Sequence, residues 1–268
     1  MSASQNSARM PSLFISHGSP MTAIMDTPAH RWLKTLGALL PRPKAILMAT
    51  AHFEEDVPVF TSDEKPEMIY DFGGFPKPLY EIVYPAPGDP DLALKAAHMV
   101  HDAGYKTGLV QNRGFDHGTW VPLKLMYPDA DIPVVQLSVQ HEKGSEHHVK
   151  LGRVLEPLRD EGVMIIGSGS LTHNLWELSR RRGEVDAKAL DWVVDFTEWV
   201  AEKVESGDVE AIGNYRTLAP HAKENHPRDE HFLPLPFAMG AGGEGTKGKR
   251  IHASYDYGLL AMDAFLFE

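Results

Sequence analysis

The sequence predicts a single-domain α/β protein with a central, mostly parallel or mixed sheet flanked by helices and a functional site at the carboxyl ends of the strands. Three short apolar runs have the length and composition of buried strands: Leu13–Ile15, Ala45–Thr50 and Val163–Ile166. Segments with helical spacing separate them, as in an α/β fold. Each run ends at a polar segment that carries a histidine. Because ligands bind at the carboxyl ends of strands in open α/β sheets, we expect these histidines to meet in one crevice.

The first half of the chain has two clear helix signals. Thr27 followed by Pro28 has the pattern of an N-cap and a first helical position, and apolar residues at helical spacing continue until Pro41 ends the helix. Asp89 caps a second predicted helix that reaches Ala103. Between these helices, residues 54–88 are rich in proline, glycine and aromatic residues. An irregular segment of this length is typical of a lid or a binding wall.

The second half of the chain predicts further alternation of strands and helices. Its strand signals are apolar runs with partial alternation, and its helix signals are apolar stripes at helical spacing. The predicted elements are a strand at Val134–Val139, a helix capped by Ser145 and reaching about Asp160, a helix at Asp186–Ser206, a surface loop at Gly240–Gly248 and a final strand at His252–Tyr257.

Length and composition limit the classes of protein to consider. The chain has 268 residues, a formal net charge of -11 and no cysteine. We therefore expect one catalytic domain over residues 11–268 after a flexible extension at residues 1–10, with no nucleic-acid or membrane partner. A soluble, cytoplasmic monomer or homodimer is expected. Without thiolates, any metal must be held by nitrogen and oxygen ligands.

Five of the 14 histidines lie among small, turn-forming or strand-ending residues, and Gly167–Ser170 forms a predicted glycine-rich loop before one of them. Any one of these histidines alone is better explained by a structural role, but together they favour a metal site or an acid–base site. Neutral imidazole is a common metal ligand, and its ordinary pKa of about 6.5 suits proton transfer near neutrality. The five are His17, His52, His117, His173 and His231.

Several ordered motifs carry a resemblance to a known family. They include HGSP at 17–20, YDFGGFP at 70–76, FDHGTW at 115–120, GSGSLTHN at 167–174 and EHFLPL at 230–235. From about residue 10 to its end, the chain resembles the class III extradiol ring-cleavage dioxygenases. The nearest branch is that of the DOPA 4,5-dioxygenase-like proteins, which are related to the catalytic subunit of protocatechuate 4,5-dioxygenase.

The resemblance implies a set of roles for the five histidines. His17, His52 and His231 would hold a mononuclear non-haem metal, with Fe(II) required for activity and Zn(II) able to occupy the same site in purified protein. His173 would be the acid–base residue, with direct ligation left open, and His117 would contact substrate or bound oxygen. The third ligand of the protocatechuate relatives is a carboxylate, so Glu230 is an alternative to His231. Adjacent side chains rarely point at one spot, so one of the two should ligate and the other should lie behind it.

The implied reaction inserts both atoms of O2 into a small aromatic diol, DOPA or a related catechol. Phe72, Phe75, Tyr80 and Tyr84 are the candidates for the apolar walls of its pocket, and packing under the long loop is their alternative role. The run that begins at Asp71, Asp-Phe-Gly, is not a kinase signal because no other kinase motif accompanies it.

Two other classes of function use the same histidines. A zinc hydrolase would activate water on the metal with Glu54 or Glu230 as general base, although the HExxH helix signature is missing. A metal-binding or interaction protein without catalysis would keep the histidine cluster, and its aromatic pocket would be filled or flat.

Overall fold

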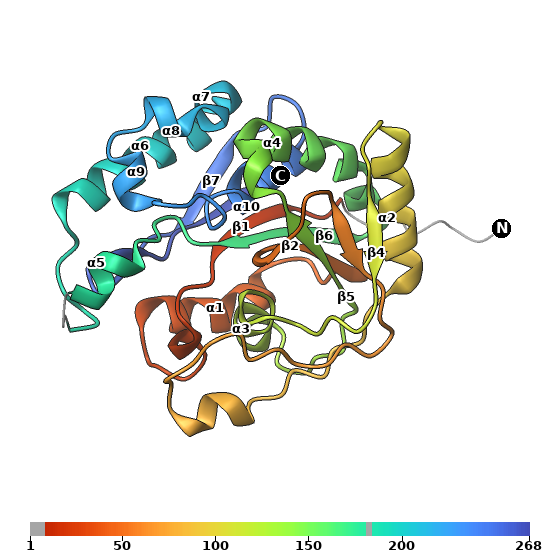
Figure 1. The fold of residues 1–268 in the computed structure, drawn as a ribbon, viewed down its shortest axis with the longest axis horizontal. Helices are drawn as coiled ribbons and strands as arrows, with labels where there is room; N and C mark the ends of the chain where they lie inside the picture. The colour runs from red at the N-terminus through yellow and green to blue at the C-terminus, as the bar shows by residue number, and fades with distance from the viewer. Residues whose placement is uncertain (1–8, 181–183) are drawn as a thin grey trace.

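An eight-stranded mixed sheet forms the centre of the computed structural model, which describes residues 9–180 and 184–268 (Figure 1). The order of strands across the sheet is β4-β3-β5-β2-β6-β1-β10-β7. Their bounds are β1 Ser12–Ser16, β2 Ala45–Glu54, β3 Val59–Thr61, β4 Gly108–Val110, β5 Val134–Val139, β6 Val163–Gly169, β7 Gly248–His252 and β10 Ala264–Phe267. A separate ribbon pairs β8 Tyr255–Asp256 with β9 Leu260–Ala261.

The four central strands run parallel, so their carboxyl ends lie at one edge of the sheet. β5, β2, β6 and β1 are neighbours in this order, with Met48 of β2 opposite Gln136 of β5 and Ile166 of β6. At the two sides the direction reverses, because β3 is antiparallel to β5 and β10 is antiparallel to β1. The predicted fold class is confirmed: this is a mixed sheet with a parallel centre.

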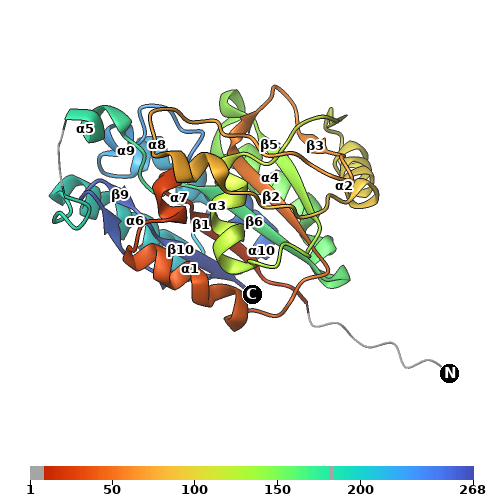
Figure 2. The ribbon, with the colours of Figure 1, turned by 90° about the horizontal axis from the view of Figure 1, so that it is seen from below.

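Helices cover both faces of the sheet. Seen from below, α1 and α3 lie in front of the sheet, while α4 and α10 pack on its other face (Figure 2). The helices are α1 Pro28–Leu39, α2 Pro90–Asp102, α3 His117–Met126, α4 Gly144–Leu155, α5 Leu175–Arg180, α6 Asp191–Ser206, α7 Val209–Gly213, α8 Tyr215–Leu218, α9 Ala222–Asn225 and α10 Pro234–Gly242. Short 3-10 turns are η1 Pro20–Ala23, η2 Lys77–Glu81, η3 His141–Lys143 and η4 Glu156–Glu161.

The alternation of side chains along β2 divides the core between the two faces. Ile46 and Met48 pack into the cluster that includes residues of α1 and α3, whereas Leu47 and Ala49 pack into the cluster of α2, α4 and α10. All four are buried. Full burial of a side chain such as Ile or Leu contributes about 1.5–3 kcal/mol, so the central strands are anchored from both sides. The polar residues at their ends are therefore presented by a rigid scaffold.

The glycine-rich segment after the third apolar run belongs to β6 and is not the loop that the sequence predicted. β6 continues to Gly169, and the backbone of the His231 segment lies directly against it. A Cβ added at Gly169 would lie 2.1 Å from the His231 carbonyl oxygen, which no side chain allows. The backbone N–H of Ser170 donates to the same carbonyl at 2.9 Å. The glycine is needed there because a strand and the chain before α10 approach each other closely.

Both helix signals of the first half are confirmed. Thr27 caps α1 by accepting a hydrogen bond on its side chain from the backbone N–H of His30 at 3.2 Å. Asp89 caps α2 in the same way, with its Oδ1 2.9 Å from the backbone nitrogen of Leu92. Each cap satisfies one of the backbone donors that a helix start leaves free.

Two helix starts of the second half differ from the prediction. α4 begins at Gly144, so Ser145 lies inside the helix, and its buried hydroxyl has no hydrogen-bond partner among the described residues. α6 begins at Asp191, five residues after the predicted start, because the backbone N–H of Leu190 bonds to Gly258 outside the helix. The end of α6 at Ser206 is the predicted one.

The predicted loop and strand near the carboxyl end are also corrected. Residues 240–242 belong to α10 and Gly248 begins β7, so the loop is confined to residues 243–247. The strand β7 ends at His252, where the predicted strand began, and Tyr255–Asp256 of the predicted strand form β8. α10 is buried along its whole length, and a Cβ at Gly240 would meet the Val149 carbonyl oxygen of α4 at 2.1 Å. The glycines of α10 allow two helices to pack closely. Because glycine usually interrupts a helix, the sequence pattern predicted a loop at this position.

The predicted extension at residues 1–10 is only partly covered by the structure. Residues 1–8 lie outside the described residues. Met10 is buried and its backbone N–H donates to the Arg159 carbonyl oxygen at 3.0 Å, and Arg9 pairs with Asp160 at 2.9 Å. The domain therefore begins by residue 9. No helix within residues 9–180 and 184–268 is long and apolar enough to cross a membrane.

Candidate metal centre

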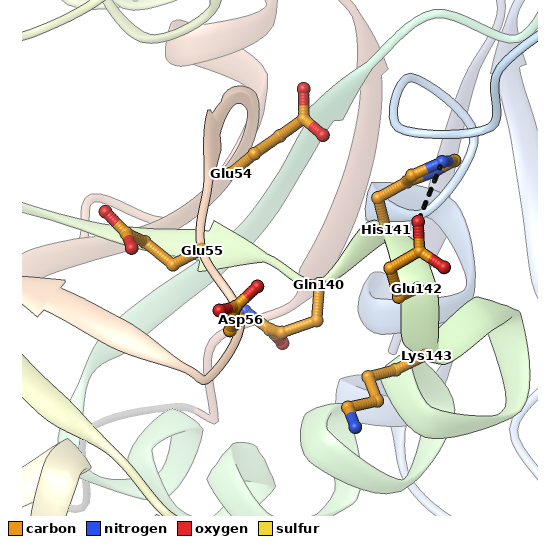
Figure 3. A pocket seen from close by; sticks show the side chains of 7 residues that line it. All are labelled: Glu54, Glu55, Asp56, Gln140, His141, Glu142 and Lys143. Atoms are coloured by element: carbon orange, nitrogen blue, oxygen red, sulfur yellow. Dashed lines mark ion pairs between the residues drawn. The ribbon is translucent and has the colours of Figure 1, made fainter.

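Two hollows open near the carboxyl ends of the central strands. The first has a volume of about 410 Å³ and is lined by Glu54, Glu55, Asp56, Gln140, His141, Glu142 and Lys143 (Figure 3). Two of its charged groups pair with residues that do not line it: the Glu54 carboxylate accepts from Arg228 at 2.7 Å, and His141 Nδ1 lies 2.5 Å from Asp229 Oδ1. We call this the acidic hollow.

The second hollow, of about 400 Å³, gathers all five histidines singled out in the sequence. His17 follows β1, His173 follows β6, and His231 precedes α10. The other two are placed differently from the prediction, because His52 lies inside β2 and His117 is the first residue of α3. The pairing of β2 with β5 is irregular between residues 49 and 54, which is the interval that holds His52.

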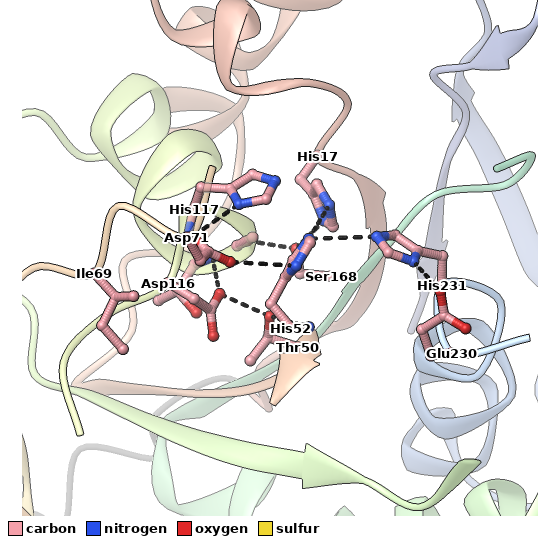
Figure 4. Close-up of polar contacts among 12 residues, drawn as sticks. His17, Thr50, His52, Ile69, Asp71, Asp116, His117, Ser168, Glu230 and His231 are labelled. Atoms are coloured by element: carbon pink, nitrogen blue, oxygen red, sulfur yellow. Dashed lines mark hydrogen bonds and ion pairs between the residues drawn. The ribbon is translucent and has the colours of Figure 1, made fainter. Parts of the chain in front are cut away.

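Three ring nitrogens converge at the floor of this hollow. His52 Nε2 lies 3.1 Å from His17 Nε2 and 3.3 Å from His231 Nε2, and Figure 4 shows the ring of His52 between the other two. Two imidazole nitrogens that share one metal ion, each bonded at about 2.1 Å, are separated by about 3.0–3.4 Å. Each of these two spacings therefore fits a pair of nitrogens that share one ion, with His52 common to both pairs.

The second nitrogen of each ring is held by an oxygen behind it. His17 Nδ1 lies 3.0 Å from Ser168 Oγ, and this hydroxyl donates its own proton to the Gly118 carbonyl oxygen at 2.5 Å. The hydroxyl can therefore only accept from His17, so the proton of this ring is on Nδ1. The lone pair is left on Nε2, the atom that faces the other rings.

Carboxylates hold the other two rings. His52 Nδ1 lies 3.3 Å from Asp71 Oδ2, and His231 Nδ1 lies 3.0 Å from Glu230 Oε1. The second oxygen of Glu230 pairs with Arg228 Nε at 3.3 Å. Glu230 thus contacts the nitrogen of His231 that is turned away from His52. A carboxylate behind a metal-binding imidazole fixes its tautomer and its orientation.

Burial keeps the three converging rings neutral. It lowers the pKa of His17 and of His231 well below the ordinary value of histidine, and neighbouring imidazoles lower both further. Burial, followed by the charge of His117, lowers the pKa of His52 to about 3. Neutral imidazole is the form that donates a lone pair to a metal, so the charge state of the cluster suits metal binding.

His117 lies beside the three converging rings. Its ring centroid is 4.0 Å from that of His52, and one ligand atom each from His17, His52 and His117 lie within 4.8 Å of one another. Asp71 Oδ1 accepts from both the ring Nδ1 of His117, at 2.9 Å, and its backbone nitrogen, at 3.0 Å. By distance alone, His117 is therefore a further candidate ligand.

Asp71 is the residue of the site that the sequence analysis missed. Burial opposes its ionisation, but the hydrogen bond from the His117 side chain and the nearby charges of His117 and His52 lower its pKa to about 2. Asp71 is part of the YDFGGFP motif, and the sequence analysis uses it only to exclude a kinase. Its position beside aromatic residues predicted to line the pocket is the sequence signal that could have identified it.

His173 lies against His231. Their ring centroids are 3.5 Å apart and their planes differ by 11°, which is a stacked arrangement. Within residues 9–180 and 184–268, no hydrogen bond is made by the ring nitrogens of His173, while its backbone N–H donates to the Asn225 carbonyl oxygen at 2.9 Å. Burial, followed by the charge of His117, lowers its pKa to about 4. The ring is therefore held in place, neutral and without a hydrogen-bond partner.

Two of the four predicted wall residues line the hollow. Phe72 and Phe75 do so, and the Phe72 ring centroid lies 5.7 Å from that of His117. Tyr80 packs behind them, with its ring centroid 5.1 Å from that of Phe72. Tyr84 has no exposed surface and belongs to the core, so its predicted place in the wall is wrong.

Polar residues such as Ser19 and Ser170 and further apolar residues complete the lining of the hollow. The sequence did not single out the apolar ones as wall residues, because they belong to η1, α5 and β9, which are distant from one another in the chain. These apolar residues are Pro20, Leu175, Leu178 and Leu260.

The two acids proposed as hydrolytic bases do not face this hollow. Glu54 lines the acidic hollow and pairs with Arg228, and Glu230 bonds to the outer nitrogen of His231. A general base must reach the water or substrate proton that it takes. The open volume also contradicts a merely metal-binding protein, for which a filled or flat pocket was expected.

Comparison with known proteins gives one consistent result. The family described as the catalytic LigB subunit of aromatic ring-opening dioxygenase matches residues 11–266. A 4,5-DOPA dioxygenase extradiol from Beta vulgaris is 44% identical over 258 residues, covering 95% of each chain. The protein of the same name from Escherichia coli is 42% identical over 240 residues, which are 88% of this chain and 86% of the relative. A crystal structure of an uncharacterized protein from Escherichia coli superposes with a TM-score of 0.78 at 33% identity, covering 97% of this chain and all of that chain.

Proposed function

This chain belongs to the LigB family of aromatic ring-opening dioxygenases and is a metal-dependent extradiol dioxygenase, and on that premise we propose that its metal is held by Nε2 of His17, His52 and His231. One observation carries the proposal. His52 Nε2 lies 3.1 Å from His17 Nε2 and 3.3 Å from His231 Nε2, and the opposite nitrogen of each of the three rings is held by an oxygen. His117 is not chosen because its ring lies on the substrate side, against Phe72.

We propose Fe(II) as the metal that supports turnover. The residues fit such an ion, since three neutral imidazoles on one side leave coordination positions open for two further ligands. Bound there, it supplies the redox chemistry that lets dioxygen react with a closed-shell catechol and brings the two together. Zn(II) fits the same donors but has no redox chemistry, so zinc-loaded protein would be inactive.

His173 is the proposed acid–base residue. Its ring is stacked on His231, and its nitrogens have no hydrogen-bond partner among the described residues. With a pKa lowered to about 4 by burial, the ring is neutral and accepts the proton of a catechol hydroxyl. It returns this proton to an oxygen of the product as the ring opens.

His117 is the proposed partner of the oxygen atoms. Because its Nδ1 donates to Asp71, the Nε2 atom is the one left for the hollow. A neutral Nε2 accepts a hydrogen bond from a hydroxyl group, and after taking a proton it donates to an oxygen that gains negative charge. Fixed hydrogen-bonding groups aimed at developing charge are an effective means of lowering a barrier.

The substrate is proposed to be a substituted catechol related to DOPA. Two curated relatives that cover most of this chain are named 4,5-DOPA dioxygenase extradiol, which suggests cleavage of the 4,5 bond. A volume of about 400 Å³ is within the usual range of small-molecule sites, about 300–1,000 Å³. Phe72 and Phe75 would lie against the aromatic ring and its substituent.

The experiment is anaerobic loading with Fe(II), followed by oxygen uptake and visible absorbance with DOPA, caffeate, protocatechuate and catechol in parallel. We expect one O2 consumed per diol and a yellow ring-opened product with at least one of them. Zinc-loaded protein, which should consume no oxygen, is the control. If protein with demonstrably bound Fe(II) consumes no oxygen with any diol, the proposal fails, and ester and amide hydrolysis become the next assays.

A further inference from the structure

We infer that Asp71 is a positioning residue that orients His52 and His117 together, so that one carboxylate prepares both the metal side and the substrate side of the site. The inference rests on the proposed ligand set. Asp71 Oδ2 lies 3.3 Å from His52 Nδ1, and Oδ1 lies 2.9 Å from His117 Nδ1 (Figure 4). The two carboxylate oxygens therefore serve two different rings.

The position of Asp71 is itself fixed by backbone pairing. The N–H of Ile69 donates to the Phe115 carbonyl oxygen at 2.8 Å, and the N–H of Phe115 donates to the Glu67 carbonyl oxygen at 2.8 Å. These bonds tie the residues just before the YDFGGFP motif to the residues just before α3. The backbone N–H of His117 then donates to Asp71 Oδ1 at 3.0 Å, so the acid is anchored at the start of that helix.

The chemistry of a carboxylate explains why an acid is needed here. Ionised Asp71 only accepts hydrogen bonds, so Nδ1 of His52 and Nδ1 of His117 both carry protons. Both Nε2 atoms then present lone pairs: that of His52 faces His17 and His231, and that of His117 faces the hollow. Without this acid, neither tautomer is specified by any other contact to Nδ1 among the described residues.

An asparagine at this position could satisfy only one of the two rings. Two donors of His117 hold Oδ1, so an amide would keep its single oxygen there and turn its NH2 group toward His52. An NH2 group donates, which requires a lone pair on His52 Nδ1 and moves the ring proton to Nε2. His52 would then present a proton in place of its metal-binding lone pair.

The test is Asp71→Asn, with Asp63→Asn as the matched control. Asp63 is an acid of the same long loop that accepts from the Asn112 backbone at 2.8 Å, and within residues 9–180 and 184–268 it forms no hydrogen bond or ion pair with an imidazole. Affinity for Zn(II), measured by chelator competition without oxygen or catechol, should fall about 10- to 100-fold in Asp71→Asn and stay at the parent value in the control. Asp71→Glu, which keeps two accepting oxygens, should recover part of the loss.

The effect of Asp71 on the substrate side is measured separately, by steady-state kinetics of Fe(II)-saturated protein. There, kcat of Asp71→Asn should be at least about 10-fold below the parent, with a smaller change in KM. Parent-like zinc affinity in Asp71→Asn would overturn the inference, and so would an unchanged kcat at saturating metal. Because the zinc measurement needs no turnover, it stays decisive even if none of the diols is a substrate.

The inference can also be tested on the parent protein, so that the result does not depend on whether a variant folds. In ¹⁵N-histidine spectra of the zinc-loaded protein, His52 and His117 should both be protonated at Nδ1. A proton on Nε2 of either ring would contradict the inference.

Discussion

The two hollows at the carboxyl ends of the strands have nearly the same volume, about 410 and 400 Å³, but different chemistry. In the acidic hollow, Glu54 and His141 pair with Arg228 and Asp229, which do not line it, and His141 also contacts Glu142 within it (Figure 3). In the histidine hollow, ring nitrogens point inward and their outer nitrogens are already bonded (Figure 4). The volume of a hollow and its number of charged residues therefore do not identify the metal site. The distinguishing feature is a set of imidazole lone pairs directed into the hollow, with an oxygen in contact with the opposite nitrogen of each ring.

The two hollows also differ in how deeply their histidine side chains are buried. His17 is 1% exposed and His231 is 5% exposed, whereas the side chain of His141 in the acidic hollow is 32% exposed. Solvent screens exposed ion pairs, so the Glu54–Arg228 pair of the acidic hollow contributes about 0–1 kcal/mol. In the histidine hollow, burial removes the positive charge from the rings and leaves neutral donors.

The largest expected effect comes from His52→Ala. This ring is central to the cluster, 3.1 and 3.3 Å from the other two nitrogens, so its removal should weaken metal binding by more than about 100-fold and abolish turnover. Chelator competition with Zn(II) measures the affinity, and thermal unfolding of the metal-free protein checks the fold. A variant with parent-like affinity would show that the metal lies elsewhere.

His173→Gln should separate proton transfer from metal binding. The ring is stacked on His231 but is not one of the three converging nitrogens, so metal affinity should stay near that of the parent. At saturating Fe(II), kcat should fall about 10²- to 10⁴-fold, the usual contribution of a general acid–base residue. Loss of the metal together with turnover would instead make His173 a ligand.

Low pH should destabilise the metal-free protein through the same buried rings. The pKa is lowered to about 3 for His52 and to about 4 for His173, in each case mainly by burial, whereas the unfolded chain titrates near 6.5. Between these values the unfolded chain binds protons that the folded chain does not, so stability falls as pH is lowered from about 6.5 toward 3. Melting temperatures at pH 7 and pH 5 measure the effect, and equal values would contradict it.

Phe72→Ala should weaken substrate binding without affecting the metal. The side chain lines the hollow beside His117 and is not bonded to any of the converging rings. KM should rise about 10-fold, as expected when a pocket loses part of an apolar wall, and Zn(II) affinity should be unchanged. Phe72→Leu, which keeps most of the apolar volume, should lie between this variant and the parent. A fall in kcat with KM unchanged would argue against a wall contact.

The smallest effect is expected in the acidic hollow. Glu142 has an 89% exposed side chain and only a long contact, 3.8 Å, to His141. Glu142→Gln should change kcat/KM less than about 2-fold and stability by no more than about 0.5 kcal/mol. Steady-state kinetics and thermal unfolding test both values. A 10-fold loss of activity would mean that this hollow takes part in the reaction.

The sequence predicted the parts of the fold that depend on local patterns. Apolar runs located β1, β2, β5 and β6, and caps at Thr27 and Asp89 located two helices. The five histidines were found because they follow strands or stand among turn residues, and the structure brings all five to one hollow.

Features set by contacts distant in sequence were not predictable in the same way. Gly169 looked like a loop residue, but its role is to let the His231 backbone approach β6. Asp71 reaches His52 and His117 through a long loop that pairs with the residues before α3, a contact between segments distant in sequence. Tyr84 resembled a wall residue because the aromatic composition of the loop does not show which ring turns into the core.

The most direct test of the central claim is a crystal structure of the protein loaded with a single metal ion under anaerobic conditions. We predict one ion at the floor of the histidine hollow, bonded at about 2.0–2.2 Å to Nε2 of His17, His52 and His231. Asp71, Ser168 and Glu230 should keep their contacts to the outer nitrogens, as they have here. An ion bonded by His117 in place of His231, or one found in the acidic hollow, would contradict the account.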